Sequence, residues 1–168
     1  MNAQREHSWS VETHSVEETQ ALGEVLASLL EPDDVVLFAG DLGAGKTHFV
    51  QGVARALGVQ APVTSPTFNI LLEYYGGRLS LYHFDLYRLD VPEELDDVNF
   101  FGTLESDGVS FVEWSEKFPE EMPDDHLAIK IEVSPDETRT ITVTGEGDRG
   151  CVLADAWQSA VVVCSHRK

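Results

Sequence analysis

The stretch VVLFAGDLGAGKT, residues 35–47, determines how the rest of the sequence is interpreted. Its first five residues are all apolar, which is typical of a strand buried on both faces of a sheet. Residues 40–47 then match the pattern G-x-x-x-x-G-K-[ST] in full, and residues 46–57 predict a helix that ends at Gly58. This order of strand, glycine-rich loop and helix predicts a phosphate-binding loop.

The chemistry expected of this loop follows from its residue types. Glycines let a backbone wrap around a phosphate with its amide groups pointing inward, and the N-terminus of the following helix adds a positive dipole end. Lys46 is expected to contact the β- and γ-phosphates of a nucleotide. The hydroxyl of Thr47 is expected to bind Mg²⁺.

The metal also requires a carboxylate, and two predicted strands end in one. Asp85 ends the segment LYHFD, and Glu113 ends the segment VSFVE. Ligands collect at the carboxyl ends of the strands in a sheet of this kind. Either acid is therefore expected to bind Mg²⁺, with the other positioning the attacking water. His83, inside the first segment, is interpreted as a packed or hydrogen-bonded residue rather than a base.

The remaining segments predict an α/β fold in a single nucleotide-binding unit. Residues 15–30 have the spacing of an amphipathic helix with a capping box at its start. Two hairpins exclude a purely parallel sheet, so we expect a three-layer P-loop NTPase with a central mixed sheet. Residues 1–145 form the expected P-loop ATPase domain, and residues 146–168 a tail, helix or strand, packed on it. The predicted strands outside the motif are residues 8–13, 68–75, 78–84, 109–114, 127–133 and 139–144.

The composition excludes several classes of protein. Thirty Asp and Glu face eleven Lys and Arg, a formal charge of −19, and such a surface repels the phosphates of a nucleic acid. We therefore expect no strong direct binding to a nucleic acid. The longest apolar stretches have five or six residues, which predicts no membrane span. The absence of an apolar leader and the two unpatterned cysteines favour a cytoplasmic protein.

Four blocks of sequence give a more specific indication. They are GDLGAGKT at 40–47, VTSPTFNILLEY at 63–74, LYHFDLYRLDVPEEL at 81–95 and FVEWSEKF at 111–118. In content, order and spacing the chain resembles the TsaE family, also called YjeE. These are bacterial P-loop ATPases needed for the threonylcarbamoyladenosine modification at position 37 of tRNAs that read codons starting with adenine.

The resemblance implies a slow Mg²⁺-dependent ATPase that acts with the proteins TsaB and TsaD. It implies catalytic roles for Lys46, Asp85 and Glu113, and metal binding by Thr47, Glu113 and Asp85. Where the family has a small residue after the loop threonine, this chain has His48. The nucleotide contacts that the resemblance implies are Gly43, Ala44, Gly45, Lys46, Thr47, His48, Thr64, Thr67, Trp114, Val16 and Arg139.

Other functions remain open at this point. A small P-loop kinase would carry several arginines to clamp its acceptor, and only Arg88 lies near a strand-end block. A GTP-binding switch protein would carry the motif N/T-K-x-D, which the sequence lacks. A nucleotide-dependent scaffold without significant turnover fits the same motifs as an ATPase. Measurement of turnover distinguishes the two.

Overall fold

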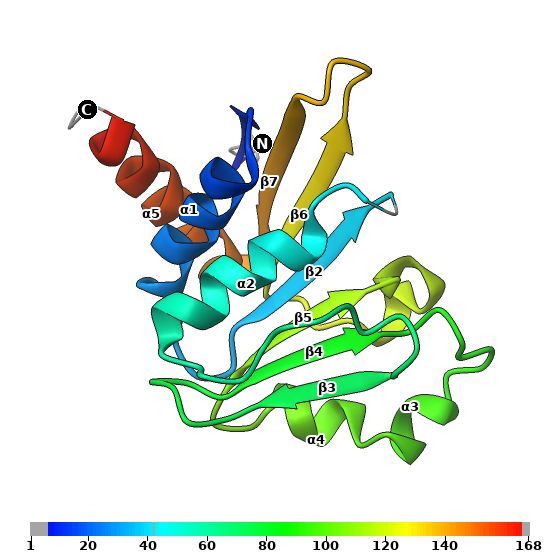
Figure 1. Cartoon of the computed structure of the whole chain (residues 1–168). Coiled ribbons are helices and arrows are strands. Elements are labelled where there is room, and N and C mark those ends of the chain that lie inside the picture. Colours follow the sequence, from blue (N-terminus) through cyan, green and yellow to red (C-terminus); the bar gives the residue numbers. More distant parts are fainter. Residues whose placement is uncertain (1–6, 42, 166–168) are drawn as a thin grey trace, which may run out of the picture.

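A seven-stranded mixed sheet forms the centre of the molecule, as the computed structural model shows (Figure 1). The structure describes residues 7–41 and 43–165. The strand order is β1-β7-β6-β2-β5-β4-β3, in which β6, β2, β5 and β4 are parallel neighbours and the other pairs are antiparallel. The prediction of a mixed sheet is confirmed. The strands are β1 (Ser8–Thr13), β2 (Val35–Gly40), β3 (Leu71–Tyr74), β4 (Leu81–Asp85), β5 (Val109–Glu113), β6 (His126–Val133) and β7 (Arg139–Glu146).

Helices cover both faces of this sheet and give three layers. One face packs against α1 (Val16–Ala27), α2 (Lys46–Leu57) and α5 (Gly147–Ser165). The other packs against the short helices α3 (Glu94–Asp97) and α4 (Phe100–Leu104). Two 3₁₀ turns, Ser115–Lys117 and Pro119–Glu121, follow β5. β2 lies between two parallel strands and between the two helix layers, so both of its faces are buried. This burial explains the continuous apolar sequence that identified the strand.

The start of α1 has the predicted capping box. The backbone amide of Glu18 donates to the hydroxyl of Ser15 at 3.1 Å. The carboxylate of Glu18 in turn accepts from the amide of His14 at 2.6 Å. These two bonds satisfy groups that a helix end would otherwise leave unpaired, and they fix where α1 begins.

The first predicted hairpin exists, but its strands are shorter than predicted. Residues 68–70 and 78–80 lie outside the ladder, which joins only β3 and β4. The connection leaves the sheet to cover the ends of two helices: the amide of Arg78 donates to Leu57 O, at the end of α2. Its guanidinium donates to the carbonyls of Ala27 and Leu30, at the end of α1. These contacts with helix-end carbonyls hold the segment from Arg78 away from the ladder.

Residues 147–165, whose sequence suits either helix or strand, form the helix α5. It packs on β7, β6 and α1, and its Trp157 is fully buried against Trp9 of β1. At its start Arg149 donates to both carboxylate oxygens of Asp34 at 2.8 Å and to Leu29 O at 3.0 Å. This contact joins α5 to the segment between α1 and β2. Within the described parts of the chain, every helix is too short or too polar to cross a membrane.

We expect Arg149→Met to lower the free energy of unfolding by about 1–3 kcal/mol, because it removes hydrogen bonds to the buried carboxylate of Asp34. Arg55→Met is the matched control, since Arg55 pairs with Glu24 on an exposed surface. Its effect should stay below about 1 kcal/mol. Urea unfolding of both variants measures the difference, and equal losses would contradict a structural role for Arg149.

Candidate nucleotide-binding site

The predicted phosphate loop connects the carboxyl end of β2 to the first residue of α2. Gly43 and Gly45 have φ angles of 81° and 108°, a region that other residues rarely adopt. Gly45 is the N-cap of α2 and supplies no side-chain cap. The first bond of the helix runs from the amide of Phe49 to Gly45 O, so the amides of Lys46, Thr47 and His48 have no intrahelical acceptor. The loop therefore presents donors suited to an anion.

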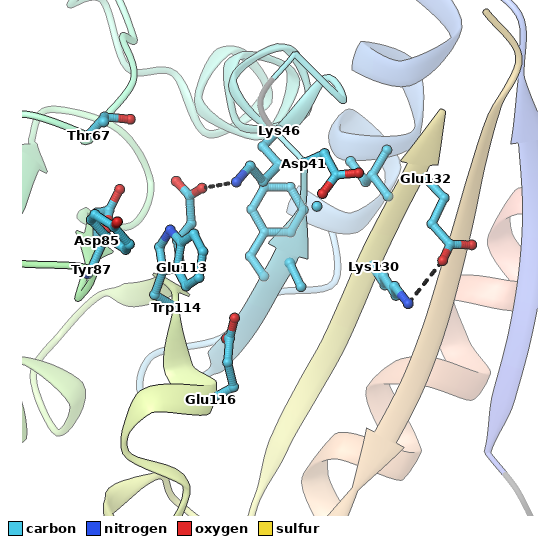
Figure 2. A pocket seen from close by; sticks show the side chains of 14 residues that line it. Asp41, Lys46, Thr67, Asp85, Tyr87, Glu113, Trp114, Glu116, Lys130 and Glu132 are labelled. Carbon is cyan, nitrogen blue, oxygen red and sulfur yellow. Dashed lines mark hydrogen bonds and ion pairs between the residues drawn. The ribbon is translucent and has the colours of Figure 1, made fainter. Parts of the chain in front are cut away.

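Glu113, the buried acid at the end of β5, contacts Lys46 with one carboxylate oxygen and His83 with the other. The ammonium nitrogen of Lys46 lies 2.6 Å from Oε1 of Glu113, and Nε2 of His83 lies 2.7 Å from Oε2 of the same carboxylate (Figure 2 shows the lysine contact). Burial alone would raise the pKa of Glu113, but its contacts with His83 and Lys46 outweigh burial and hold the pKa below its ordinary value. Glu113 is therefore a charged group with a cation beside it, at the position expected of a strand-end acid.

Asp85 lies beside Glu113, because the parallel register of β4 and β5 pairs the two residues. It is 5% exposed, and its Oδ1 accepts from the amide of Tyr87 at 3.0 Å. Burial raises the pKa of Asp85, the hydrogen bond from Tyr87 opposes that rise, and the charge of Glu113 adds to it. The two predicted acids thus form one pair at the carboxyl edge of the sheet. Asp85 has fewer close partners than Glu113.

A cavity of about 480 Å³ opens over these groups (Figure 2). Five of the predicted residues line it: Lys46, Thr67, Asp85, Glu113 and Trp114. The sequence interpretation did not select the other polar and aromatic side chains of its wall. These are Phe38, Asp41, Tyr87, Glu116, Lys130 and Glu132.

An aromatic pair forms one wall of this cavity. The rings of Tyr87 and Trp114 have centroids 4.9 Å apart, and both side chains are exposed. Trp114 has a φ of 63°, which is uncommon for a bulky residue. This backbone turn ends β5, and the ring of Trp114 lines the same cavity as Glu113. Tyr87 comes two residues after Asp85, so the ends of neighbouring strands supply the two rings.

The other predicted contact residues do not line the cavity. Arg139, at the start of β7, donates from Nε to Ala44 O at 2.8 Å and packs against Gly45. It therefore contacts the loop without lining the cavity. Val16 is the first residue of α1. Thr19, on the same helix, also approaches Gly45.

Thr47, His48 and Thr64 also lie outside the cavity wall. Thr47 is half-buried in the first turn of α2. The ring of His48 contacts Gln51 on its own helix at 3.1 Å. The amide of Thr64 donates to the hydroxyl of Tyr74 at 3.2 Å.

The residues present fit a magnesium ion only together with a phosphate. In the described residues, no group of three or more His, Cys, Asp or Glu side chains could hold a metal ion. Mg²⁺ is usually bound through one or two protein groups plus phosphate oxygens and water. The pair Asp85 and Glu113, which lines the cavity together with Lys46 of the phosphate loop, provides such groups.

Comparison with known proteins points to one family. A family model described as threonylcarbamoyl adenosine biosynthesis protein TsaE matches residues 13–141. The tRNA threonylcarbamoyladenosine biosynthesis protein TsaE of Bacillus subtilis is 42% identical over 143 residues, covering 85% of this chain and 89% of that protein. That of Treponema pallidum is 42% identical over 131 residues, covering 78% and 96%. The crystal structure of Bacillus subtilis YdiB matches with a TM-score of 0.77 at 35% identity, covering 94% of this chain and 98% of that one.

Proposed function

The chain belongs to the TsaE family, which functions in the biosynthesis of threonylcarbamoyladenosine in tRNA, and from this premise we propose that it is a slow, Mg²⁺-dependent ATPase. We further propose that it acts in the cytoplasm with the TsaB and TsaD proteins. The modification would be the one at position 37 of tRNAs that read codons starting with adenine.

One observation carries the ATPase proposal: Lys46, the lysine of the phosphate loop, contacts a buried strand-end carboxylate inside a cavity of about 480 Å³. That cavity is of the size that small-molecule sites usually have. An isolated structural ion pair would not require the glycine-rich loop or the uncapped amides beside it. The same groups suit the binding of a polyphosphate.

Each residue then has a distinct task. The amides of the loop bind the phosphates, and Lys46 leaves Glu113 to contact the β- and γ-phosphates. Mg²⁺, when bound, would supply positive charge that neutralises the charge developing during hydrolysis. Thr47 and one of the two acids hold the metal, and the other acid orients the attacking water. The rings of Tyr87 and Trp114 cover one side of the cavity and limit the access of bulk water.

The direct test is phosphate release from ATP and Mg²⁺ by the purified chain, alone and with TsaB and TsaD. We expect slow release by the chain alone and faster release with both proteins. If the chain binds ATP but releases no phosphate in either condition, it is a nucleotide-dependent scaffold and not an ATPase. Transfer of phosphate to an added metabolite would identify a kinase.

We expect the chain alone to bind tRNA only weakly, and to reach its pathway through proteins. Residues 85–97 contain six acids against one arginine, and residues 116–125 contain five acids against one lysine. Both segments follow strands that end at the cavity, so a basic partner surface could approach there, with an affinity that falls as salt rises. A mobility-shift titration at low salt tests this. Tight binding of tRNA by the chain alone would contradict the charge argument.

A further inference from the structure

His83 is a polar residue at the centre of an otherwise apolar part of the sheet. It lies in the middle of β4, is fully buried, and is paired in register with Leu72 of β3 and Phe111 of β5. Its neighbours in the strand are Tyr82 and Phe84, which belong to the core on the opposite face. Burial of a polar ring without a partner costs free energy, so a histidine here requires a compensating contact.

The compensating contact is with Glu113. His83 Nε2 lies 2.7 Å from Oε2, although the oxygen is off the line of the ring N–H, so the contact is mainly electrostatic. Nδ1 has no hydrogen-bond partner among residues 7–41 and 43–165. The tautomer with its proton on Nε2 suits this geometry. If the proton were on Nδ1, it would have no acceptor, and the unprotonated Nε2 of His83 would face Oε2 of Glu113, which is also an acceptor.

Glu113 therefore has one donor on each oxygen, and the two donors differ in mobility. Lys46 lies on the first turn of α2, has a long flexible side chain, and is 18% exposed at the cavity. His83 is held in the sheet with no exposed surface. When phosphate draws Lys46 away, the contact with His83 is the one that Glu113 keeps, because Glu113 is only 4% exposed.

We propose that His83 is a positioning residue, which holds the carboxylate of Glu113 in place once Lys46 has moved to the phosphates. The inference rests on the proposed function, because it gives Glu113 its task in the nucleotide-bound chain. His83 does not touch the nucleotide in this account. It acts through the orientation of Glu113, and Asp85, two residues along the same strand, remains free to complete the acid pair.

Three substitutions separate this role from simple packing. His83→Gln can place an amide donor where Nε2 lies, His83→Asn places one nearer Nδ1, and His83→Leu removes both. Loss of a residue that orients a metal-site ligand typically costs about 10-fold to 100-fold in activity. We expect that loss in kcat for the Leu and Asn variants, with a smaller change in KM and substantial rescue by Gln. Tyr82→Phe is the control, since its hydroxyl contacts Asp107 on the other face of the sheet and its kcat should not change.

A second readout does not depend on turnover. Nitrogen NMR of the histidine rings reports which ring nitrogen carries the proton, and the signal that disappears in His83→Gln identifies His83. We expect the proton on Nε2 both with and without ADP and Mg²⁺. A proton on Nδ1 would overturn the inference, as would normal kcat in a folded His83→Asn variant. If the unaltered chain lacks turnover, the proposed function fails separately, and the NMR result still decides whether His83 holds Glu113. If the Leu variant does not fold, the Gln and Asn variants give the comparison.

Discussion

Lys46→Ala is expected to lower ATP turnover by about 100-fold or more, the loss typical when a charge aimed at the transition state is removed. Lys46 is the cation that the loop places beside the acid pair, so no neighbouring residue of the loop can replace it. Phosphate release and nucleotide affinity should be measured across a magnesium titration. The variant should still fold, because Glu113 retains its contact with His83.

Lys130→Ala is the matched control for this experiment. Lys130 lines the same cavity, but it is exposed and pairs with Glu132 at 2.9 Å. Its removal should leave turnover close to that of the unaltered chain. Near-normal turnover in Lys46→Ala would refute the assignment of the site, and equal losses in both variants would indicate a general electrostatic effect.

Glu113→Ala and Asp85→Ala are each expected to lower turnover by at least about tenfold, because each removes a charge that the reaction requires in a fixed position. Both acids are buried at the ends of adjacent parallel strands. Glu113→Ala should also weaken the magnesium dependence of nucleotide binding. Binding measured with and without Mg²⁺ separates this effect from the loss of turnover.

The opposite result is equally informative. Both oxygens of Glu113 already have partners, whereas Asp85 accepts from the amide of Tyr87. If only Asp85→Ala weakens the magnesium dependence, Asp85 is the metal ligand and Glu113 positions water. Glu116→Ala is the control, because Glu116 is an exposed acid in the wall of the same cavity. A loss there as large as in the other two would exclude specific roles for the buried pair.

The central part of the fold was predictable because its signals are local. The strand β2, the glycine loop and α2 follow one another without a break, and the capping box marks the start of α1. The acids at the ends of β4 and β5 were found because parallel strands bring such residues to one edge. These inferences require only the residue pattern and the order of the elements.

The remaining features depend on contacts between distant segments. Residues 78–80 leave the predicted strand because Arg78 bonds to carbonyls of two helix ends that the hairpin sequence does not reveal. The contact of His83 with Glu113 depends on the register of β4 against β5. Likewise Arg139 bonds to Ala44 across 95 positions, so this contact with the loop depends on where β7 lies in the assembled sheet.

The position of β1 has a consequence for the order in which the molecule is completed during synthesis. β1 is made first, but its partner in the sheet is β7, with Ser8 opposite Thr144, and Trp9 also donates to Ala154 O in α5. A ribosome releases the N-terminal strand more than a hundred residues before either partner exists. Residues 8–13 therefore stay unpaired, with the ring of Trp9 exposed, while the parallel strands assemble. Because Arg139 arrives with β7, the same late step that completes the sheet also supplies the side chain that bonds to Ala44 in the phosphate loop.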